Sequence, residues 1–332
     1  MSVVVPTIGR PSLLAKGLRS ILDCDPGPSE VIVVDQSTCT KTKDLVADCG
    51  DVRVRRVACS GRGAALARNI GVRSASHDVV MFTDDDCHVA VDWVGVAFRH
   101  LLTHPGAIVT GQVLAGVGGD GVVPSTIADV EPRDWTGILS RGALYSGNMA
   151  GDRNALCRVG PFDERRSLRL AAEDNDLCFR WVRSGGRLLY APDMVVWHED
   201  WRSPAELRTV YSRYARGQGA FYAKHLVRGD TVIARFVVED LRRGFRVRAA
   251  RILKRRRNAS MEALAILPWM LVGIADGLVD SVVHAVAHWP TQRTDRSSLA
   301  SKPAELAENA TPGATADRGD QSGRRDRCGA DE

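Results

Sequence analysis

The stretch Val79-Val80-Met81-Phe82-Thr83-Asp84-Asp85-Asp86 joins an apolar run to three consecutive carboxylates, the acidic triad. An uninterrupted apolar run with β-branched residues is typical of a strand buried on both faces of a sheet. Three adjacent acids repel one another, so we expect a positive partner, and Mg²⁺ or Mn²⁺ carrying a phosphate suits carboxylate oxygens best. If the extended geometry continues, Asp84 and Asp86 point to one side and Asp85 to the other. The alternative is an acidic loop or a helix N-cap before the segment from Val91.

Strand-like and helical segments alternate on both sides of this stretch. Strand patterns cover residues 2–6, 31–35, 52–57, 79–82, 107–114, 187–191 and 194–197. Helical patterns cover residues 11–22, 40–48, 63–74, 91–103, 173–184 and 203–226, and residues 115–140 are expected to form loops. This alternation predicts an α/β fold with right-handed crossovers and a mostly parallel central sheet flanked by helices. Ligands of such sheets bind beyond the carboxyl ends of the strands, where the acidic triad falls.

Composition and charge describe an ordinary globular chain with one unusual block. The 332 residues are 44% hydrophobic and 26% charged, which is enough for a sizeable core and about two domains. The net charge is +5, but nine basic residues and no acid lie between Leu241 and Arg257. The eight cysteines form no CxxC pair, so their spacing predicts neither a zinc site nor a disulfide framework. Because Met1 runs almost directly into a strand pattern without a signal-type segment, we expect a cytoplasmic protein with reduced thiols.

The C-terminal third divides into a helical extension and a polar tail. We expect a catalytic domain over 1–226, a basic and amphipathic extension over 227–290, and a disordered tail over 291–332, where almost nothing is apolar. Within 261–287, a charge-free run precedes acids and histidines that recur every four residues, which predicts a helix with one polar face more readily than a metal site. Two interpretations remain open. The helix either docks on an anionic membrane beside the basic block, or packs on the catalytic domain or on a second subunit.

Seven motifs occur in the order and spacing found in family 2 glycosyltransferases, and the resemblance covers about residues 2 to 225. The motifs are Val5-Pro6-Thr7 with Arg10, Val33-Val34-Asp35, Ala67-Arg68-Asn69-Ile70-Gly71, Asp84-Asp85-Asp86, Gly147-Asn148-Met149-Ala150, Gly160-Pro161-Phe162-Asp163-Glu164, and Glu173-Asp174-Asn175-Asp176-Leu177-Cys178-Phe179-Arg180. The resemblance implies the GT-A fold and transfer of a sugar from a nucleotide-diphosphate donor to a hydroxyl acceptor, with inversion and with Mg or Mn. The chain departs from the family pattern at Gln36, at Ile8-Gly9 and at Ala172, where Gly is common.

The resemblance also implies a donor site and a metal site. Asp35 resembles the acid that contacts the nucleoside, at the end of its strand. Asp84 would face the ribose and the metal shell, and Asp86 and His198 would ligate the cation. The other residues expected to bind the donor are Pro6, Thr7, Arg10, Arg68, Asn69 and Asp85. Competing interpretations are a helix cap for Asp35, surface salt bridges for the two arginines and a structural role for the histidine.

Inversion by a single displacement requires a base for the acceptor hydroxyl. Asp174 resembles that base, with Glu173 and Asp176 beside it, although acids at a helix start also complement the helix dipole. Asn148, Arg153 and Glu173 are expected where the donor sugar meets the acceptor. The tryptophans that could either stack on sugar rings or pack in the core are Trp135, Trp197 and Trp201.

We therefore expect an inverting, metal-dependent glycosyltransferase that uses a nucleotide-diphosphate sugar, in first place a UDP-sugar, to build a polysaccharide, glycolipid or cell-surface glycan. One alternative is a metal-dependent nucleotidyltransferase, which usually has a glycine- and lysine-rich phosphate loop that is missing here. A second is a non-catalytic module that binds nucleotide sugars. Expected partners are the donor, a glycan or lipid-linked acceptor and the cytoplasmic face of an anionic membrane. Only the basic block points to nucleic acid, which is not an expected partner.

Overall fold

The computed structural model describes residues 1–116, 123, 125–137, 146–168, 171–199, 202–254 and 261–287, and Met1–His288 forms one compact unit. The strands are β1 (Ser2–Thr7), β2 (Glu30–Asp35), β3 (Val54–Ala58), β4 (Val79–Thr83), β5 (Cys87–Val89), β6 (Ile108–Ala115), β7 (Arg133–Thr136), β8 (Asn148–Asp152) and β9 (Arg187–His198). The helices are α1 (Pro11–Leu22), α2 (Lys41–Asp48), α3 (Ala64–Ser74), α4 (Trp93–Thr103), α5 (Arg153–Val159), α6 (Glu173–Arg183), α7 (Pro204–Val227), α8 (Thr231–Lys254) and α9 (Met261–Ala287). The tail expected to be disordered, 291–332, lies outside the described residues.

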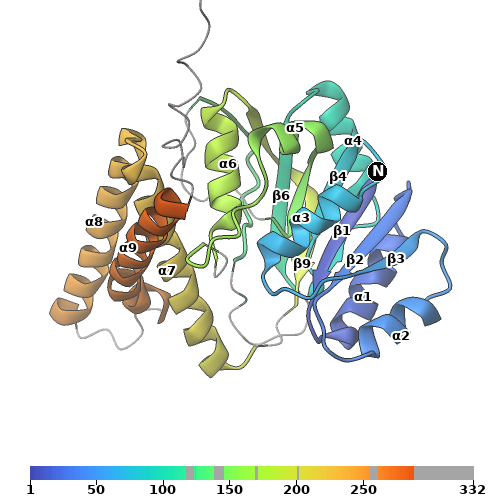
Figure 1. Cartoon of the computed structure of the whole chain (residues 1–332), viewed down its shortest axis with the longest axis horizontal. Coiled ribbons are helices and arrows are strands. Elements are labelled where there is room, and N and C mark those ends of the chain that lie inside the picture. Colours follow the sequence, from blue (N-terminus) through green and yellow to red (C-terminus); the bar gives the residue numbers. More distant parts are fainter. Residues whose placement is uncertain are drawn as a thin grey trace, which may run out of the picture. The chain divides into compact units, whose positions relative to one another are not determined.

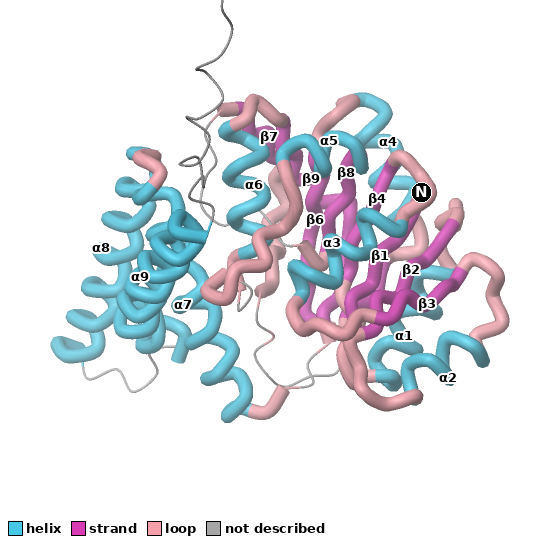
Figure 2. The backbone as a smooth tube through the Cα atoms, in the orientation of Figure 1, coloured by secondary structure: helices cyan, strands magenta, loops and turns pink. Residues whose placement is uncertain are grey.

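The strands form one mixed sheet in the order β3-β2-β1-β4-β8-β6-β9-β5, with β7 paired to β9 (Figure 2). Strands β3, β2, β1 and β4 are parallel, whereas β8 runs antiparallel between β4 and β6. The carboxyl ends of β1, β2 and β4 therefore meet at one edge, which the start of antiparallel β8 also reaches. The predicted mostly parallel sheet with flanking helices and a helical C-terminal region is confirmed.

Helices cover both faces of the sheet because side chains alternate along each strand. Val3 and Val5 of β1 belong to a buried cluster that contains residues of α1 and α4. Val4, between them, belongs to the opposite cluster, which contains residues of α3, α5 and α6. In Figure 1, α3, α5 and α6 lie over the near face of the sheet. Because β1, β2 and β4 are apolar on both faces, they are fixed between two helical layers and hold their polar ends in place.

The structure corrects the sequence interpretation in two segments. The strands expected at 187–191 and 194–197 are one strand, β9, whose pairing with β6 shifts register between Gly111 and Gln112. A side chain at Gly111 would collide with the Met194 carbonyl, so the shift depends on glycine there. The segment 115–140, expected to form loops, contains β7, which pairs with β9. Neither β7, with four residues, nor β5, with three, is long enough to show an alternating pattern.

Helix α9 packs closely on α7 through small residues. Gly219 on α7 faces Gly273 on α9, and a side chain at Gly273 would collide with the carbonyl of Arg216. Asp276 pairs with Arg216, and Asp280 accepts a hydrogen bond from the Ser167 backbone nitrogen at 2.7 Å. These acids support the polar-face interpretation of the four-residue stripe. One helical stretch of the described chain, Leu267–Ala285, has the length and apolar composition of a membrane span, with 22% of it buried.

Candidate active site

The acidic triad lies in a tight turn between β4 and β5. The backbone nitrogen of Cys87 donates a hydrogen bond to the Asp84 carbonyl at 3.1 Å, which closes the turn. The extended geometry therefore ends at Thr83, and Asp84 and Asp86 do not project side by side from a strand. Instead, Asp84 contacts Arg68, whereas Asp85 and Asp86 share Arg10.

Asp85 is the buried member of the triad. Its carboxylate accepts a hydrogen bond from Thr7 Oγ1 at 2.6 Å and pairs with Arg10 Nη2 at 2.5 Å. Burial and the adjacent charge of Asp86 raise the pKa of Asp85 to about 7, although Arg10 and Thr7 oppose the shift. Asp85 thus links the carboxyl ends of β1 and β4 and fixes the position of the Arg10 guanidinium at this edge of the sheet.

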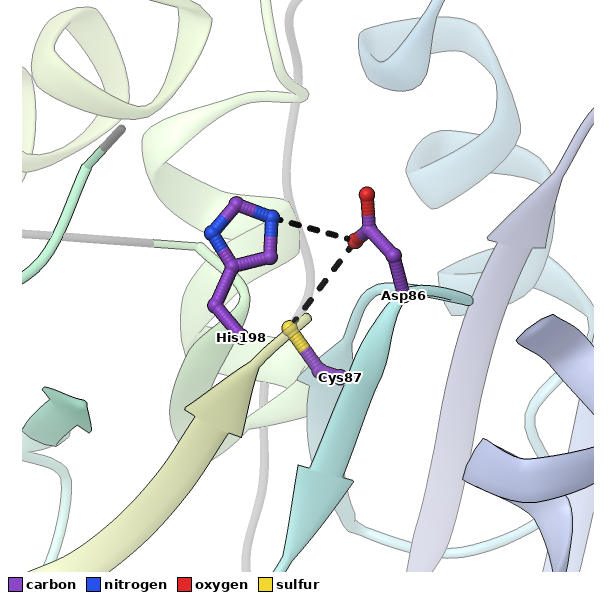
Figure 3. A group of neighbouring side chains, drawn as sticks. All are labelled: Asp86, Cys87 and His198. Carbon is purple, nitrogen blue, oxygen red and sulfur yellow. Dashed lines mark hydrogen bonds and ion pairs between the residues drawn. The ribbon is translucent and has the colours of Figure 1, made fainter. Parts of the chain in front are cut away.

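Asp86 and His198 meet because β5 pairs with the end of β9 (Figure 3). Asp86 Oδ1 lies 3.4 Å from His198 Nε2, and both side chains are buried. Asp86 Oδ2 accepts from Arg10 Nη1 at 2.8 Å and from Arg202 Nη2 at 3.2 Å. The carboxylate is therefore surrounded by cationic or polar nitrogen donors, which offset its burial.

This group fits a divalent cation. Ligand atoms of Asp86, Cys87 and His198 all lie within 4.8 Å of one another. Burial raises the pKa of the Cys87 thiol well above its usual value, and a thiol is a softer ligand than the oxygen donors that Mg or Mn prefers. Asp86 and His198 are the residues that would hold the metal, and a carboxylate with an imidazole suits Mn more than Mg.

Arg68 links the acidic triad to the start of α6. Its guanidinium donates to Asp84 Oδ1 at 2.7 Å and to Glu173 Oε1 at 2.8 Å. Burial disfavours the Arg68 cation, but the nearby acids, Asp84 and Glu173 first, keep its pKa above the usual value. Two acidic motifs that are distant in sequence therefore lie on either side of one buried cation. The alternative interpretation of Arg68 as part of a surface salt bridge is wrong, because its side chain is buried.

Glu173 and Asp174 differ in surroundings from Asp176. Burial raises the pKa of both Glu173 and Asp174, with Arg68 opposing the shift in each case. Asp174 accepts weak hydrogen bonds from the backbone and hydroxyl of Ser146, each at 3.4 Å. Of the three acids of α6, Asp174 is the one that is not fully buried, so a bound group can reach it.

Asp176 has a structural environment. Lys224, His225 and Arg180 contact its buried carboxylate at 2.5, 2.8 and 2.8 Å. Burial alone would raise the pKa of Asp176, but these hydrogen bonds and charges hold it below its usual value. Asp176 therefore anchors α6 to α7, and only Glu173 and Asp174 of the three acids face the triad's side of the helix.

The turn before α6 is strained at Ala172. This residue has φ of 79°, a left-handed conformation that favours glycine. Ala172 stands where the family commonly has glycine. The alanine side chain makes this left-handed backbone conformation less favourable than it would be for glycine. The strain is borne immediately before the two acids of the candidate site, where such strain tends to be retained.

The nucleoside end of the expected donor site lies over β1 and β2. Asp35 is buried at the end of β2 and accepts from Arg56 Nε at 2.7 Å and from the Ser37 backbone at 2.9 Å. Burial works against its charge, but these bonds hold the pKa of Asp35 below its usual value, so it is ionised. Pro6 and Thr7 end the neighbouring strand at the same level, opposite Val34 and Asp35.

Two asparagines of the expected site are engaged by the protein itself. Asn69 hydrogen-bonds the backbone of Phe162 in both directions, at 2.9 Å each, and donates to Glu164. Asn148 accepts from Trp93 Nε1 at 2.9 Å and donates to the carbonyls of Gln112 and Met194. Both side chains are buried. Asn69 positions the loop after α5, and Asn148 positions the register shift between β6 and β9. A contact of either asparagine with a bound substrate stays a prediction.

Arg153 is not brought to this edge. Strand β8 runs antiparallel to β4, with Asn148 opposite Thr83 and Asp152 opposite Val79. Arg153 follows Asp152 at the far edge, where its guanidinium donates to the Ala75 carbonyl. The expectation that Arg153 lies where donor and acceptor meet is therefore corrected: a five-residue strand separates it from that edge.

Sequence reasoning missed Arg202, Arg56 and Ser146. Arg202 contacts both Asp86 and His198, at 3.2 and 3.4 Å, and its position four residues after His198 was a local clue. Arg56 comes from the paired strand β3, and no motif marks it. Of the tryptophans, Trp135 packs against the core and Trp197 lies opposite His88 in the sheet, whereas Trp201 lies outside the described residues.

Comparison with known sequences agrees with this geometry. The family described as glycosyl transferase family 2 matches residues 2–166. A pre-mycofactocin glycosyltransferase of Mycobacterium tuberculosis is 28% identical over 207 residues, which cover 60% of this chain and 42% of the relative. The chain thus matches less than half the length of that relative.

Solved structures share the fold. The mannosyltransferase PcManGT of Pyrobaculum calidifontis, in complex with GDP-Man and Mn²⁺, superposes with a TM-score of 0.55 at 22% identity, covering 86% of each chain. Staphylococcus aureus TarS 1-349 gives a TM-score of 0.52 at 19% identity, covering 89% of this chain and 93% of that one. At these identities the likeness establishes a GT-A-type architecture.

Proposed function

Because the chain belongs to glycosyl transferase family 2, we propose that it is an inverting glycosyltransferase that moves a sugar from a nucleotide-diphosphate sugar, in first place a UDP-sugar, to a hydroxyl acceptor. The observation that carries the proposal is the Arg68 bridge, which holds Asp84 and Glu173 within hydrogen-bonding distance of one guanidinium. A donor over the triad would thereby lie next to Asp174. A binding module that only senses nucleotide sugars would have no need for a second acidic group at that place.

In this proposal the donor nucleoside lies over β1 and β2. The ionised Asp35 accepts hydrogen bonds from the base or ribose, and Pro6 and Thr7 form the floor beside it. The diphosphate lies over the triad, within reach of Arg10 and Arg202, whose guanidinium groups match phosphate oxygens. Asp86 and His198 would hold a divalent cation, which when bound acts as a Lewis acid on the leaving diphosphate.

The proposed transfer is a single displacement at the anomeric carbon. The acceptor oxygen forms a bond to that carbon as the bond from the carbon to the diphosphate oxygen breaks, and the diphosphate leaves with the electron pair. Asp174 takes the hydroxyl proton on the face opposite the leaving group. Arg68 offsets one negative charge of the pair Asp84 and Glu173 while this happens, so that the donor's negative charge meets less uncompensated acid.

The acceptor is proposed to be a hydroxyl of a growing polysaccharide, glycolipid or cell-surface glycan. The name of the relative, a pre-mycofactocin glycosyltransferase, suggests a second acceptor, which is pre-mycofactocin or a molecule like it. A nucleotidyltransferase is less well supported, because a second carboxylate poised as a base, Asp174, is what sugar transfer to a hydroxyl requires.

A thermal-shift panel tests the donor site. UDP-, GDP- and dTDP-sugars would each be added with and without Mn²⁺, because solved relatives of this fold include complexes with UDP and with GDP-Man. We expect one nucleotide to raise the melting temperature by roughly 3 °C or more, and only with the metal, since a ligand at 20 times its Kd stabilises by about 1.8 kcal/mol. Equal stabilisation by all three, or by Mn²⁺ alone, would contradict a base-selective donor site.

We also propose that the protein acts at the cytoplasmic face of an anionic membrane. Residues of α9 that face away from α7 expose apolar side chains over several turns, 40 to 63% of each: Leu271, Val272, Leu278, Val279, Val282 and Val283. Helix α8 adds exposed Phe245 and exposed Arg242, Arg243 and Arg246. Exposed apolar side chains on α9 and exposed arginines on the adjacent helix α8 complement an anionic lipid surface better than they do water.

Removing three of these charges tests the membrane proposal without damaging the helix packing. Because α9 packs closely on α7, deletion of 241–287 would disturb the fold, so point variants are preferable. We expect Arg242→Ser/Arg243→Ser/Arg246→Ser to weaken binding to phosphatidylserine vesicles by about 100-fold, at about 1 kcal/mol for each charge. The control Lys16→Ser/Arg19→Ser/Arg73→Ser removes the same charge from exposed positions of α1 and α3. Equal co-sedimentation of the two variants would rule out this surface.

A further inference from the structure

A cavity lies at the end of α6 opposite the candidate active site. It has a volume of about 870 Å³ and is bounded by the last turns of α5, α6 and α7. Helix α6 begins with Glu173 and Asp174 at the site and ends at Arg183 on the cavity wall. Its 11 residues span about 16 Å, so the two places are separated by the length of the helix. No residue of the proposed transfer mechanism lines this cavity.

Positive charge dominates the cavity wall. Four arginines line it, Arg158, Arg180, Arg183 and Arg228, against a single acid, Asp230. Arg183 pairs with Asp230 at 3.0 Å, and Arg180 pairs with Asp176 at 2.8 Å. Arg158 and Arg228 are exposed and have no ion pair with any residue that the structure describes. Two of the four arginines on the wall therefore have their charge offset by an acid, and two do not.

Part of this wall is fixed in place before any ligand arrives. Arg180 donates to the carbonyls of Val159, Gly160 and Pro161, at 2.8, 3.2 and 2.7 Å, as well as to Asp176. His225 beside it is buried against Asp176 at 2.8 Å. Half-buried Val159 forms the apolar floor of the cavity, and Phe179 and Trp181 lie behind the wall, where both are almost completely buried. A cavity with an apolar floor and a few convergent polar groups is the usual form of a small-molecule site.

We propose that this cavity binds a small soluble molecule that carries a phosphate group, with Arg158 and Arg228 as the arginines that hold the phosphate. The two unpaired guanidinium groups match the charge of a phosphate dianion and can each donate two hydrogen bonds to it. The volume exceeds what inorganic phosphate needs, and the half-buried Val159 offers apolar contact to the rest of the molecule. The proposal does not depend on the transfer reaction proposed above.

Isothermal titration calorimetry with glucose 6-phosphate and with inorganic phosphate tests this site. EDTA would be present, so that metal-dependent binding at the acidic triad does not contribute. We expect glucose 6-phosphate to bind more tightly than inorganic phosphate, and Arg158→Ser/Arg228→Ser to weaken its binding at least about tenfold, since hydrogen bonds to charged groups are the strong ones. Both arginines are exposed, so the double variant should fold normally, which a melting curve would verify.

Three comparisons make the result decisive. The control Arg19→Ser/Arg73→Ser removes the same charge from exposed positions on α1 and α3 and should bind like the wild type. Equal weakening in both double variants would mean general charge attraction, and loss of binding in Arg10→Ser would place the phosphate at the acidic triad; either result overturns the proposal. Phosphatidic acid vesicles provide the third comparison. Arg158/Arg228-dependent binding to them but not to glucose 6-phosphate would mean a lipid headgroup, and would also overturn it.

Discussion

Asp86→Asn should lower kcat/KM for sugar transfer by about three orders of magnitude. Asp86 offers one oxygen toward His198 and the other to Arg10 and Arg202, at 2.8 and 3.2 Å. An amide is a poorer ligand for a hard cation, so the variant should bind the metal more weakly. The amide also has no charge to attract Arg10 and Arg202, so it no longer holds the two guanidinium groups in place. Loss of about 4 kcal/mol of charge stabilisation on the leaving diphosphate corresponds to that factor.

The measurement compares initial transfer rates over a range of Mn²⁺ concentrations, with Mn²⁺ binding followed by calorimetry. Asp48→Asn on α2 makes the same chemical change at an exposed position and should transfer at the wild-type rate. Normal turnover of Asp86→Asn would remove this residue from the mechanism. A wild-type enzyme that keeps its rate in EDTA, while Asp86→Asn does not transfer, would mean that Asp86 acts by holding Arg10 and Arg202 and not by holding a metal.

The edge of the sheet that carries this chemistry could be predicted because its signals are local. Strands buried on both faces, such as β1 and β4, appear as uninterrupted apolar runs, and their ends are marked where polar residues begin. Asp35 ends β2 and Asp84 follows β4, so their common edge follows from parallel strand order, whereas Asp174 begins α6, which Arg68 links to that edge. The start of α6 can also be predicted from a local signal, because acids are favoured at a helix N-terminus.

What could not be predicted depends on strand direction and on partners distant in sequence. Arg153 is expected from the sequence where the donor sugar meets the acceptor, as Asn148 is, but β8 runs antiparallel and carries the chain to the far edge at about 3.3 Å per residue. The three acids at 173–176 carry the same kind of group, so the sequence does not distinguish them. In the structure Lys224 and His225 of α7 bind Asp176, which gives this acid a structural role. No pattern within α6 encodes what a later helix will place against it.

Asp174→Asn should bind donor as the wild type does and transfer sugar 10² to 10⁴ times more slowly, the usual contribution of a general base. The substitution keeps the shape of the side chain, and the one amide oxygen can still accept from the Asn175 backbone, which donates at 2.8 Å, while only the weak contact with Ser146 at 3.4 Å is lost. Donor binding should therefore survive, because the donor contacts proposed here lie on the triad side of Arg68. The effect should appear in kcat and not in the Kd for the donor.

The pH profile separates a base from a merely structural acid. Burial raises the pKa of Asp174 above its usual value of 3.8, although Arg68 opposes the shift, and only the ionised form accepts a proton. The wild-type kcat/KM should therefore rise with pH through that raised pKa and then level, because the active form accumulates as the proton leaves. In Asp174→Asn this acid limb should vanish, and in Asp48→Asn it should persist. A variant that is slow but keeps the limb would assign the base to another group, and Glu173, whose pKa burial also raises, would be the next to test.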